Sequence, residues 1–332
     1  MMQLIPPKSR RAPRILGKRG EPAHYHVVSR VVDRTFRLTD ADKEAFRGLL
    51  RRVAEFCGVH VLTYAILDNH FHLLLEVPAS PGDPDDEELR RRGRLLYGKE
   101  RKRQPLSFFR IDRALEAGGE IRDQMRALLI GRMASLPMFV KILKQRFSII
   151  YNRKHDRLGT LWEDRFHSVL VEDSGAALTA VAAYIDLNPV RAGIVQDPKD
   201  YRFSGYGEAA GTQRGFAQFP LFVRLAADYA ESTGQIATLY RRRLFISGSN
   251  PGKGGVVSKA ALTRVLRQDG KLPASESLYC RLRYMTQGAV IGSKAFIQEW
   301  IAENKSIYFP KRPKKPKPLV FSEDAATLCS LR

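Results

Sequence analysis

The strongest constraint on the fold is the pattern with which the chain begins. Residues 24–30, HYHVVSR, alternate β-branched and aromatic residues with polar ones, as a strand does. Residues 40–57 then carry apolar side chains at helical spacing, after a capping residue at Thr39 or Asp40 and before a closing Gly58. A strand followed directly by an amphipathic helix therefore opens the fold.

Two more strands follow at once. Residues 59–67 and 70–77 are both rich in strand-forming side chains, and only Asp68 and Asn69 separate them. Such a short polar connection is typical of a β-hairpin. Strand, helix and hairpin in this order predict an α+β fold, an antiparallel sheet with helices on one face.

Composition divides the rest of the chain. In residues 79–103, Pro81, Gly82 and Pro84 lead into an acidic run and then into many arginines and lysines, which indicates an insertion with a basic helical arm or a solvated surface helix. Helical patterns resume over about 121–134 and 137–151, residues 160–171 could form a further strand or hairpin, and short helical segments follow from about residue 216 until Pro and Lys alternate near the end. The sequence predicts a basic leader over 1–20, a core domain over 21–215 with the insertion at 79–103, a helical extension over 216–305, and a basic, proline-rich tail over 306–332.

Charge indicates the kind of partner. The 332 residues include 56 Lys and Arg against 35 Asp and Glu, a net charge of +21. Such an excess favours a polyanion, because each phosphate that binds Lys or Arg releases a condensed counterion. No apolar run is long enough for a membrane span or a secretory signal, and three scattered cysteines match neither disulfides nor zinc spacing. We expect a cytoplasmic protein that binds nucleic acid and no membrane.

The sharpest local feature is the pair His70 and His72. Residues two apart on a strand project from the same face, so both imidazoles point together while Phe71 faces the core. Two adjacent imidazoles are suited to a divalent metal, although histidines also occur in protein cores without one. The pair is a candidate metal site that lacks a third ligand.

Two tyrosines could supply the remaining chemistry. Tyr184 and Asn188 lie four residues apart near the end of a helix over 174–187, hence on one face. Tyr151 and His155 have the same spacing, and spacing does not choose between the pairs. If a metal polarised a phosphodiester and a neighbouring phenolate attacked its phosphorus, a phosphotyrosine linkage would form.

At this point the motifs resemble a known family. Residues 68–78 (DNHFHLLLEVP), 26–30 (HVVSR) and 184–193 (YIDLNPVRAG) are similar to motifs of the single-tyrosine HUH transposases, in particular the REP-associated tyrosine transposases. The resemblance covers roughly residues 20–210. It implies a ferredoxin-like α+β domain that nicks and rejoins single-stranded or hairpin DNA, with the nucleoid as its place of action.

The resemblance also assigns roles to residues. It implies Tyr184 as the nucleophile and His70, His72 and Asn188 as ligands of Mg²⁺ or Mn²⁺, and it makes Tyr151 a packing or DNA-facing residue. Rejoining by reversal requires no nucleotide cofactor, and a homodimer is one alternative for the assembly. The candidate DNA-binding residues are Arg30, Arg153, Lys154, Arg165 and Arg191.

Two alternatives accompany this assignment. A protein of the same fold could bind hairpin DNA as a regulator without cutting it. A basic RNA-binding or ribosome-associated module would explain the charge but leave the histidine pair without a purpose. Formation of a covalent DNA adduct separates the enzyme from the regulator.

Overall fold

The computed structural model describes residues 15–18, 20–35, 37–98, 106–212, 215–248, 288–308, 317–318 and 325–329. Most of the predicted leader, part of the predicted extension and most of the predicted tail lie outside these residues. The strands are β1 (Ala23–Arg30), β2 (His60–Ile66), β3 (His70–Val77), β4 (His167–Val171), β5 (Gly288–Ser293), β6 (Lys317–Pro318) and β7 (Ala325–Cys329). The helices are α1 (Asp40–Cys57), α2 (Asp86–Tyr97), α3 (Phe108–Ala117), α4 (Gly119–Ile130), α5 (Leu136–Lys154), α6 (Gly175–Asp186), α7 (Asn188–Arg191), α8 (Gly205–Ala210), α9 (Gly215–Gln218), α10 (Pro220–Tyr229), α11 (Thr233–Gly248) and α14 (Lys294–Tyr308). Among the described residues, no helix is both long and apolar enough to cross a bilayer.

The sheet has the strand order β2-β3-β1-β4-β5-β7-β6. Its first four strands are antiparallel neighbours in the ferredoxin-like order, and β2 and β3 form the predicted hairpin. The first helix is also as predicted: Thr39 caps α1 by accepting from the Asp42 amide, and Gly58 ends it with φ of 63°. The predicted α+β class is confirmed.

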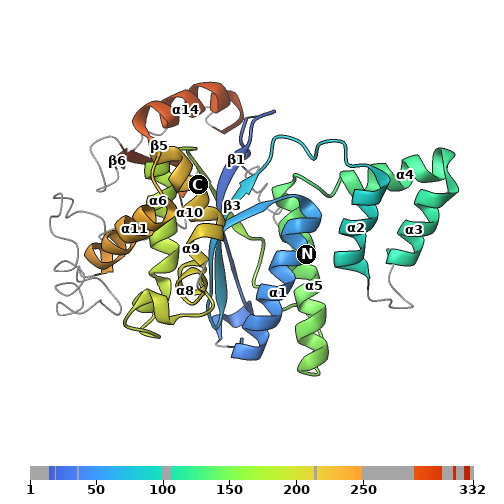
Figure 1. The fold of residues 1–332 in the computed structure, drawn as a ribbon, viewed down its shortest axis with the longest axis horizontal. Coiled ribbons are helices and arrows are strands. Elements are labelled where there is room, and N and C mark those ends of the chain that lie inside the picture. Colours follow the sequence, from blue (N-terminus) through green and yellow to red (C-terminus); the bar gives the residue numbers. More distant parts are fainter. Residues whose placement is uncertain are drawn as a thin grey trace, which may run out of the picture.

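Helices cover both faces of this sheet, not one (Figure 1). On the first face, Phe71 and Leu73 of β3 pack with Phe46 of α1 and Phe147 of α5. On the second, residues of α6, α10 and α11 form a separate apolar cluster that includes Leu74 of β3. The one-face prediction is wrong because the second face also carries apolar residues, among them Leu62 of β2, Leu74 of β3 and Val169 of β4, and these need a cover as well.

The predicted helical extension also contributes a strand. Residues 288–293 form β5, which pairs in parallel with β4, so that Val290 lies opposite Leu170. The prediction of helices alone is therefore wrong for this segment. Its short apolar stretch is stabilised by long-range pairing with β4, which no local pattern reveals.

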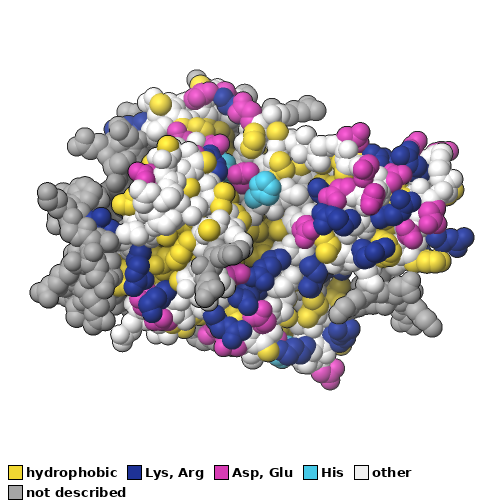
Figure 2. All heavy atoms as spheres, viewed as in Figure 1, with side chains coloured by type: hydrophobic (Ala, Val, Ile, Leu, Met, Phe, Trp, Pro, Cys, Tyr) yellow, Lys and Arg dark blue, Asp and Glu magenta, His cyan; other side chains and the backbone are white. Residues whose placement is uncertain are grey.

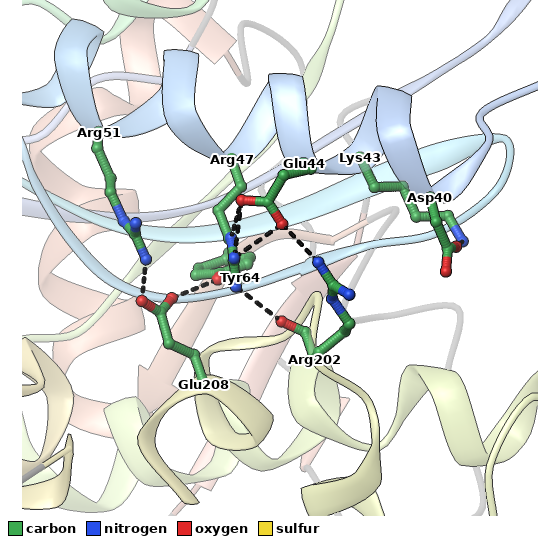
Figure 3. A network of polar contacts seen from close by, with 8 residues as sticks. All are labelled: Asp40, Lys43, Glu44, Arg47, Arg51, Tyr64, Arg202 and Glu208. Carbon is green, nitrogen blue, oxygen red and sulfur yellow. Dashed lines mark hydrogen bonds and ion pairs between the residues drawn. The ribbon is translucent and has the colours of Figure 1, made fainter. Parts of the chain in front are cut away.

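A polar network closes the edge of the sheet beyond β2 (Figure 3). Arg47 of α1 donates to the backbone oxygen of Arg202 at 3.1 Å, and the Arg202 guanidinium donates to Glu44 of α1 at 2.9 Å. Tyr64 of β2 donates to Glu208 of α8. The network joins the helical layers of the two faces and covers an edge that would otherwise be open to pairing.

Candidate active site

The two histidines of β3 lie on the second face of the sheet, beneath α6. Their ring centroids are 5.0 Å apart. His70 opens the strand opposite Arg30 of β1, and its Nδ1 lies 2.6 Å from Asn69 Oδ1. His72 is almost fully buried. Strand alternation thus brings together the imidazole pair that the sequence predicts.

A third histidine completes this cluster, and sequence reasoning did not assign it a role. His26 of β1 is fully buried, its Nε2 lies 3.0 Å from His72 Nδ1, and the two rings stack with centroids 5.2 Å apart. The signal was available, because a histidine in the first strand of this fold lies beside the central strand β3. Whether His26 lies against His72 depends on how β1 pairs with β3, which the sequence alone does not show.

Helix α6 brings Tyr184 to the histidines. The helix begins at the cap Ser174, whose side chain accepts from the Ala177 amide, and its apolar residues face both the sheet and α10–α11. The Tyr184 ring centroid lies 5.7 Å from that of His26 and 5.8 Å from that of His72, edge-on in both cases. A phenol and two imidazoles are therefore in direct ring contact.

Tyr151 lies elsewhere. It belongs to the apolar cluster on the first face of the sheet, donates to the backbone oxygen of Arg37 at 3.2 Å and stacks on His155 with centroids 4.2 Å apart. Of the two tyrosines with equal spacing, the structure brings Tyr184 to the histidines and Tyr151 into packing.

Asn188 follows Tyr184 by one helical turn at the start of α7. Its Nδ2 donates to the backbone oxygens of Tyr184 at 2.9 Å and of Ile185 at 3.3 Å. These bonds occupy the amide nitrogen and leave the amide oxygen as the atom that could bind a cation.

Two of the predicted DNA-binding arginines surround the phenol. Arg191 of α7 lies over the Tyr184 ring, 5.0 Å from the guanidinium carbon to the centroid, and donates to the Tyr184 backbone oxygen at 3.2 Å. Arg30 is exposed at the end of β1, beside His70. The charges of both arginines therefore act on the Tyr184 phenol.

The other three candidates lie away from the phenol. Arg153 and Arg165 are exposed, on α5 and just before β4. Lys154 forms an ion pair with the buried carboxylate of Asp42 at 2.7 Å, so part of its charge is used within the protein. Arg153 and Arg165 are thus exposed to solvent, whereas Lys154 has a structural role.

Arginines in the described part of the basic insertion, residues 79–98, form ion pairs with nearby carboxylates. Arg91 and Arg92 pair with Glu88, and Arg122 and Arg126 of α4 pair with Asp86. Figure 2 shows Lys and Arg side chains intermingled with Asp and Glu over the α2–α4 lobe. This lobe fits the alternative of a solvated, salt-bridged surface better than that of a basic arm.

Burial controls the protonation of the site. Burial lowers the pKa of His70 to about 4, and the charge of Arg30 acts in the same direction. Burial also holds the pKa of His72 well below its ordinary value. Burial raises the pKa of Tyr184, while Arg191 and Arg30 oppose that rise. His70 and His72 are therefore neutral at physiological pH, and the two arginines favour the phenolate of Tyr184.

These donors fit a divalent metal. His70 donates from Nδ1 to Asn69, which leaves a lone pair on its Nε2 for a metal. In the tautomer of His72 that donates from Nδ1 to His26, Nε2 also keeps a lone pair. Within the described part of the chain, no three His, Cys, Asp or Glu residues are grouped to hold a metal ion. Two imidazoles would thus need oxygen ligands as well, from the amide of Asn188 or from bound phosphate.

Comparison with known proteins agrees with the resemblance seen in the motifs. Residues 21–81, which span β1 to β3, match the family described as "Transposase IS200 like". One similar solved structure is the "Structure of the REP associates tyrosine transposase bound to a REP hairpin", with 15% identity, a TM-score of 0.37, and coverage of 60% of this chain and 84% of that chain. No curated protein matches this chain.

Proposed function

We propose that this protein is a transposase that nicks and rejoins single-stranded DNA through a 5′-phosphotyrosine on Tyr184. The observation that carries the proposal is the ring contact of Tyr184 with His26 and His72. The three residues come from three different elements, α6, β1 and β3. The family match supports it, because residues 21–81 contain the His70–His72 strand. DNA strands that fold into hairpins are the expected substrate.

The chain's own residues supply most of the chemistry. Arg30 and Arg191 bind the scissile phosphate and stabilise the phenolate. The Tyr184 phenol gives its proton to water, its oxygen bonds to phosphorus, and the bond from phosphorus to the 3′ oxygen breaks. The 3′ oxygen takes up a proton from water and leaves as a free 3′-hydroxyl. Attack by another 3′-hydroxyl reverses the step, so the joining reaction consumes no nucleotide.

Mg²⁺ or Mn²⁺ on His70, His72 and Asn188 would polarise the phosphodiester. His26 has a supporting role in this scheme. It accepts from His72 Nδ1 in the tautomer that leaves His72 Nε2 available, and it fixes the plane of that ring by stacking.

The test is a covalent adduct. A labelled library of single-stranded hairpins is incubated with the protein and Mn²⁺, and protein-bound label is counted after denaturation. We expect the wild type and Tyr151→Phe to form the adduct and Tyr184→Phe to form none while still binding DNA. Tyr151→Phe is the matched control, because it also removes one buried tyrosine hydroxyl.

Two results would contradict the proposal. Wild-type protein that binds the hairpins but forms no adduct would favour the non-cleaving regulator. An adduct that survives Tyr184→Phe and disappears in Tyr151→Phe would place the nucleophile on α5.

A further inference from the structure

A buried carboxylate lies near the end of the helix that carries Tyr184. Asp186 is fully buried and accepts from three donors: Thr63 Oγ1 at 2.9 Å, Tyr240 Oη at 2.6 Å and the Tyr206 amide at 3.3 Å. A carboxylate out of contact with water is tolerated only when such donors replace its hydration. The three contacts are therefore a built site and not a surface cluster.

The donors come from three different elements. Thr63 belongs to β2, Tyr206 to α8 and Tyr240 to α11. Thr63 and Tyr240 are themselves buried. Asp186 thus fastens α6 to the sheet on one side and to a helix of the predicted extension on the other.

This attachment lies two residues from the phenol. Tyr184 contacts the histidines of β1 and β3, whereas Asp186 contacts β2, the next strand of the same sheet. Residues two apart on a helix point in nearly opposite directions. Contacts on two different sides of α6 therefore restrain its rotation about its own axis, and the hydrogen bond between Asp186 and Thr63 of β2 helps to fix the rotation that aims Tyr184 at the histidines.

We infer that Asp186 and Tyr240 are positioning residues that hold Tyr184 against His26 and His72. The inference rests on the proposed function and deepens it, because it gives α11, outside the core motifs, a part in the reaction. A displacement of about 1 Å in a reacting group can slow catalysis on the order of a hundredfold. Arg241, next to Tyr240, supports the arrangement by an ion pair with Asp197 at 2.9 Å.

The test variant is Tyr240→Phe, which keeps the ring and removes the hydroxyl bonded to Asp186. Tyr201→Phe is the matched control, because the Tyr201 hydroxyl is also buried but donates to the backbone oxygen of Ile66 at 2.6 Å. Circular dichroism first establishes that both variants fold. The rate of adduct formation at saturating hairpin DNA and the Kd for that DNA are then measured.

We expect Tyr240→Phe to slow adduct formation about tenfold or more with Kd within twofold of wild type, and Tyr201→Phe to keep the wild-type rate. A purely stabilising residue would lower the folded fraction without this separation of rate from binding. A wild-type rate in Tyr240→Phe would overturn the inference.

A second readout does not depend on catalysis. Nitration of Tyr184 by tetranitromethane, followed by peptide mass spectrometry, reports whether the ring leaves its buried place. We expect Tyr240→Phe to raise this nitration several-fold and Tyr201→Phe to leave it unchanged; a wild-type level in Tyr240→Phe overturns the inference. Should wild-type protein form no adduct, the proposed function fails, and nitration alone decides whether Asp186 and Tyr240 position the ring.

Discussion

The carboxylate of Asp42 joins the start of α1 to the end of α5, and its removal should have a pH-dependent effect. Asp42 is 2% exposed. It accepts from Lys154 Nζ at 2.7 Å and interacts with His155 Nε2 at 2.9 Å, and it completes the capping box with Thr39. Asp42→Asn keeps the shape of the side chain and removes its charge.

The magnitude follows from the pKa. Burial alone would raise the pKa of Asp42, but hydrogen bonds from Lys154, Thr39 and His155 outweigh it and lower the pKa from 3.8 to about 2. A lowered folded-state pKa stabilises the protein above the unfolded pKa, and this contribution is lost as pH falls through the folded value. The charge therefore contributes roughly 2 kcal/mol at pH 5 and above, and roughly half of that at pH 3.

Urea unfolding of wild type and Asp42→Asn at pH 5 and pH 3 measures this contribution. We expect the difference in unfolding free energy to shrink by about 1 kcal/mol between the two pH values. Asp40→Asn is the control, since Asp40 is an exposed carboxylate in the same helical turn and should contribute at most about 1 kcal/mol. An equal difference at both pH values would refute the reasoning.

Three further predictions concern charge and packing. Arg191→Met should slow adduct formation by up to about a hundredfold, since a charge 5.0 Å from the Tyr184 ring centroid contributes at most about 3 kcal/mol to phenolate stability, and Arg191→Lys should slow it less. The control Arg202→Met removes another ring-stacked arginine and should keep the wild-type rate. Equal rates in all three variants would refute the role of Arg191. Phe71→Ala should lower the free energy of unfolding in urea by about 3–5 kcal/mol, because the ring is fully buried. Leu158→Ala, at a side chain that is 94% exposed, should change it by less than about 0.5 kcal/mol, and similar losses in the two variants would contradict the packing argument. Hairpin affinity measured by fluorescence anisotropy should fall steeply from about 50 to about 200 mM salt, and a flat response would argue against phosphate contacts.

The local parts of the fold were predictable from the sequence. The hairpin at Asp68 and Asn69, the α1 boundaries at Thr39 and Gly58, and the α6 cap at Ser174 all depend on residues within a few positions of each other. Side-chain chemistry near the ends of an element determines these boundaries. They could therefore be found without knowledge of the tertiary structure.

The candidate site was only partly predictable. Strand period places His70 and His72 together, but the choice of Tyr184 over Tyr151 depends on which sheet face each helix covers. His26 was missed because its role requires the pairing of β1 with β3. Helical spacing and strand alternation predict which residues share a face of one helix or strand. They do not predict which helices and strands pack against each other.

The remaining features depend on contacts between distant positions. Asp186 stands within a recognisable motif, yet its partner Tyr240 lies 54 residues later. Strand β5 is recognisable only through its pairing with β4. The residues next to Asp186 and next to 288–293 carry no pattern that predicts the hydrogen bond to Tyr240 or the pairing with β4.

The place of β5 in the sheet has a consequence for biosynthesis. A nascent chain that has emerged only through α11 already contains β1 to β4, but the outer edge of β4 still lacks its neighbour. Until residues 288–293 leave the ribosome, that edge presents unpaired backbone groups to any other extended chain nearby. Helices α6 to α11 are thus made while the outer edge of β4 is still open.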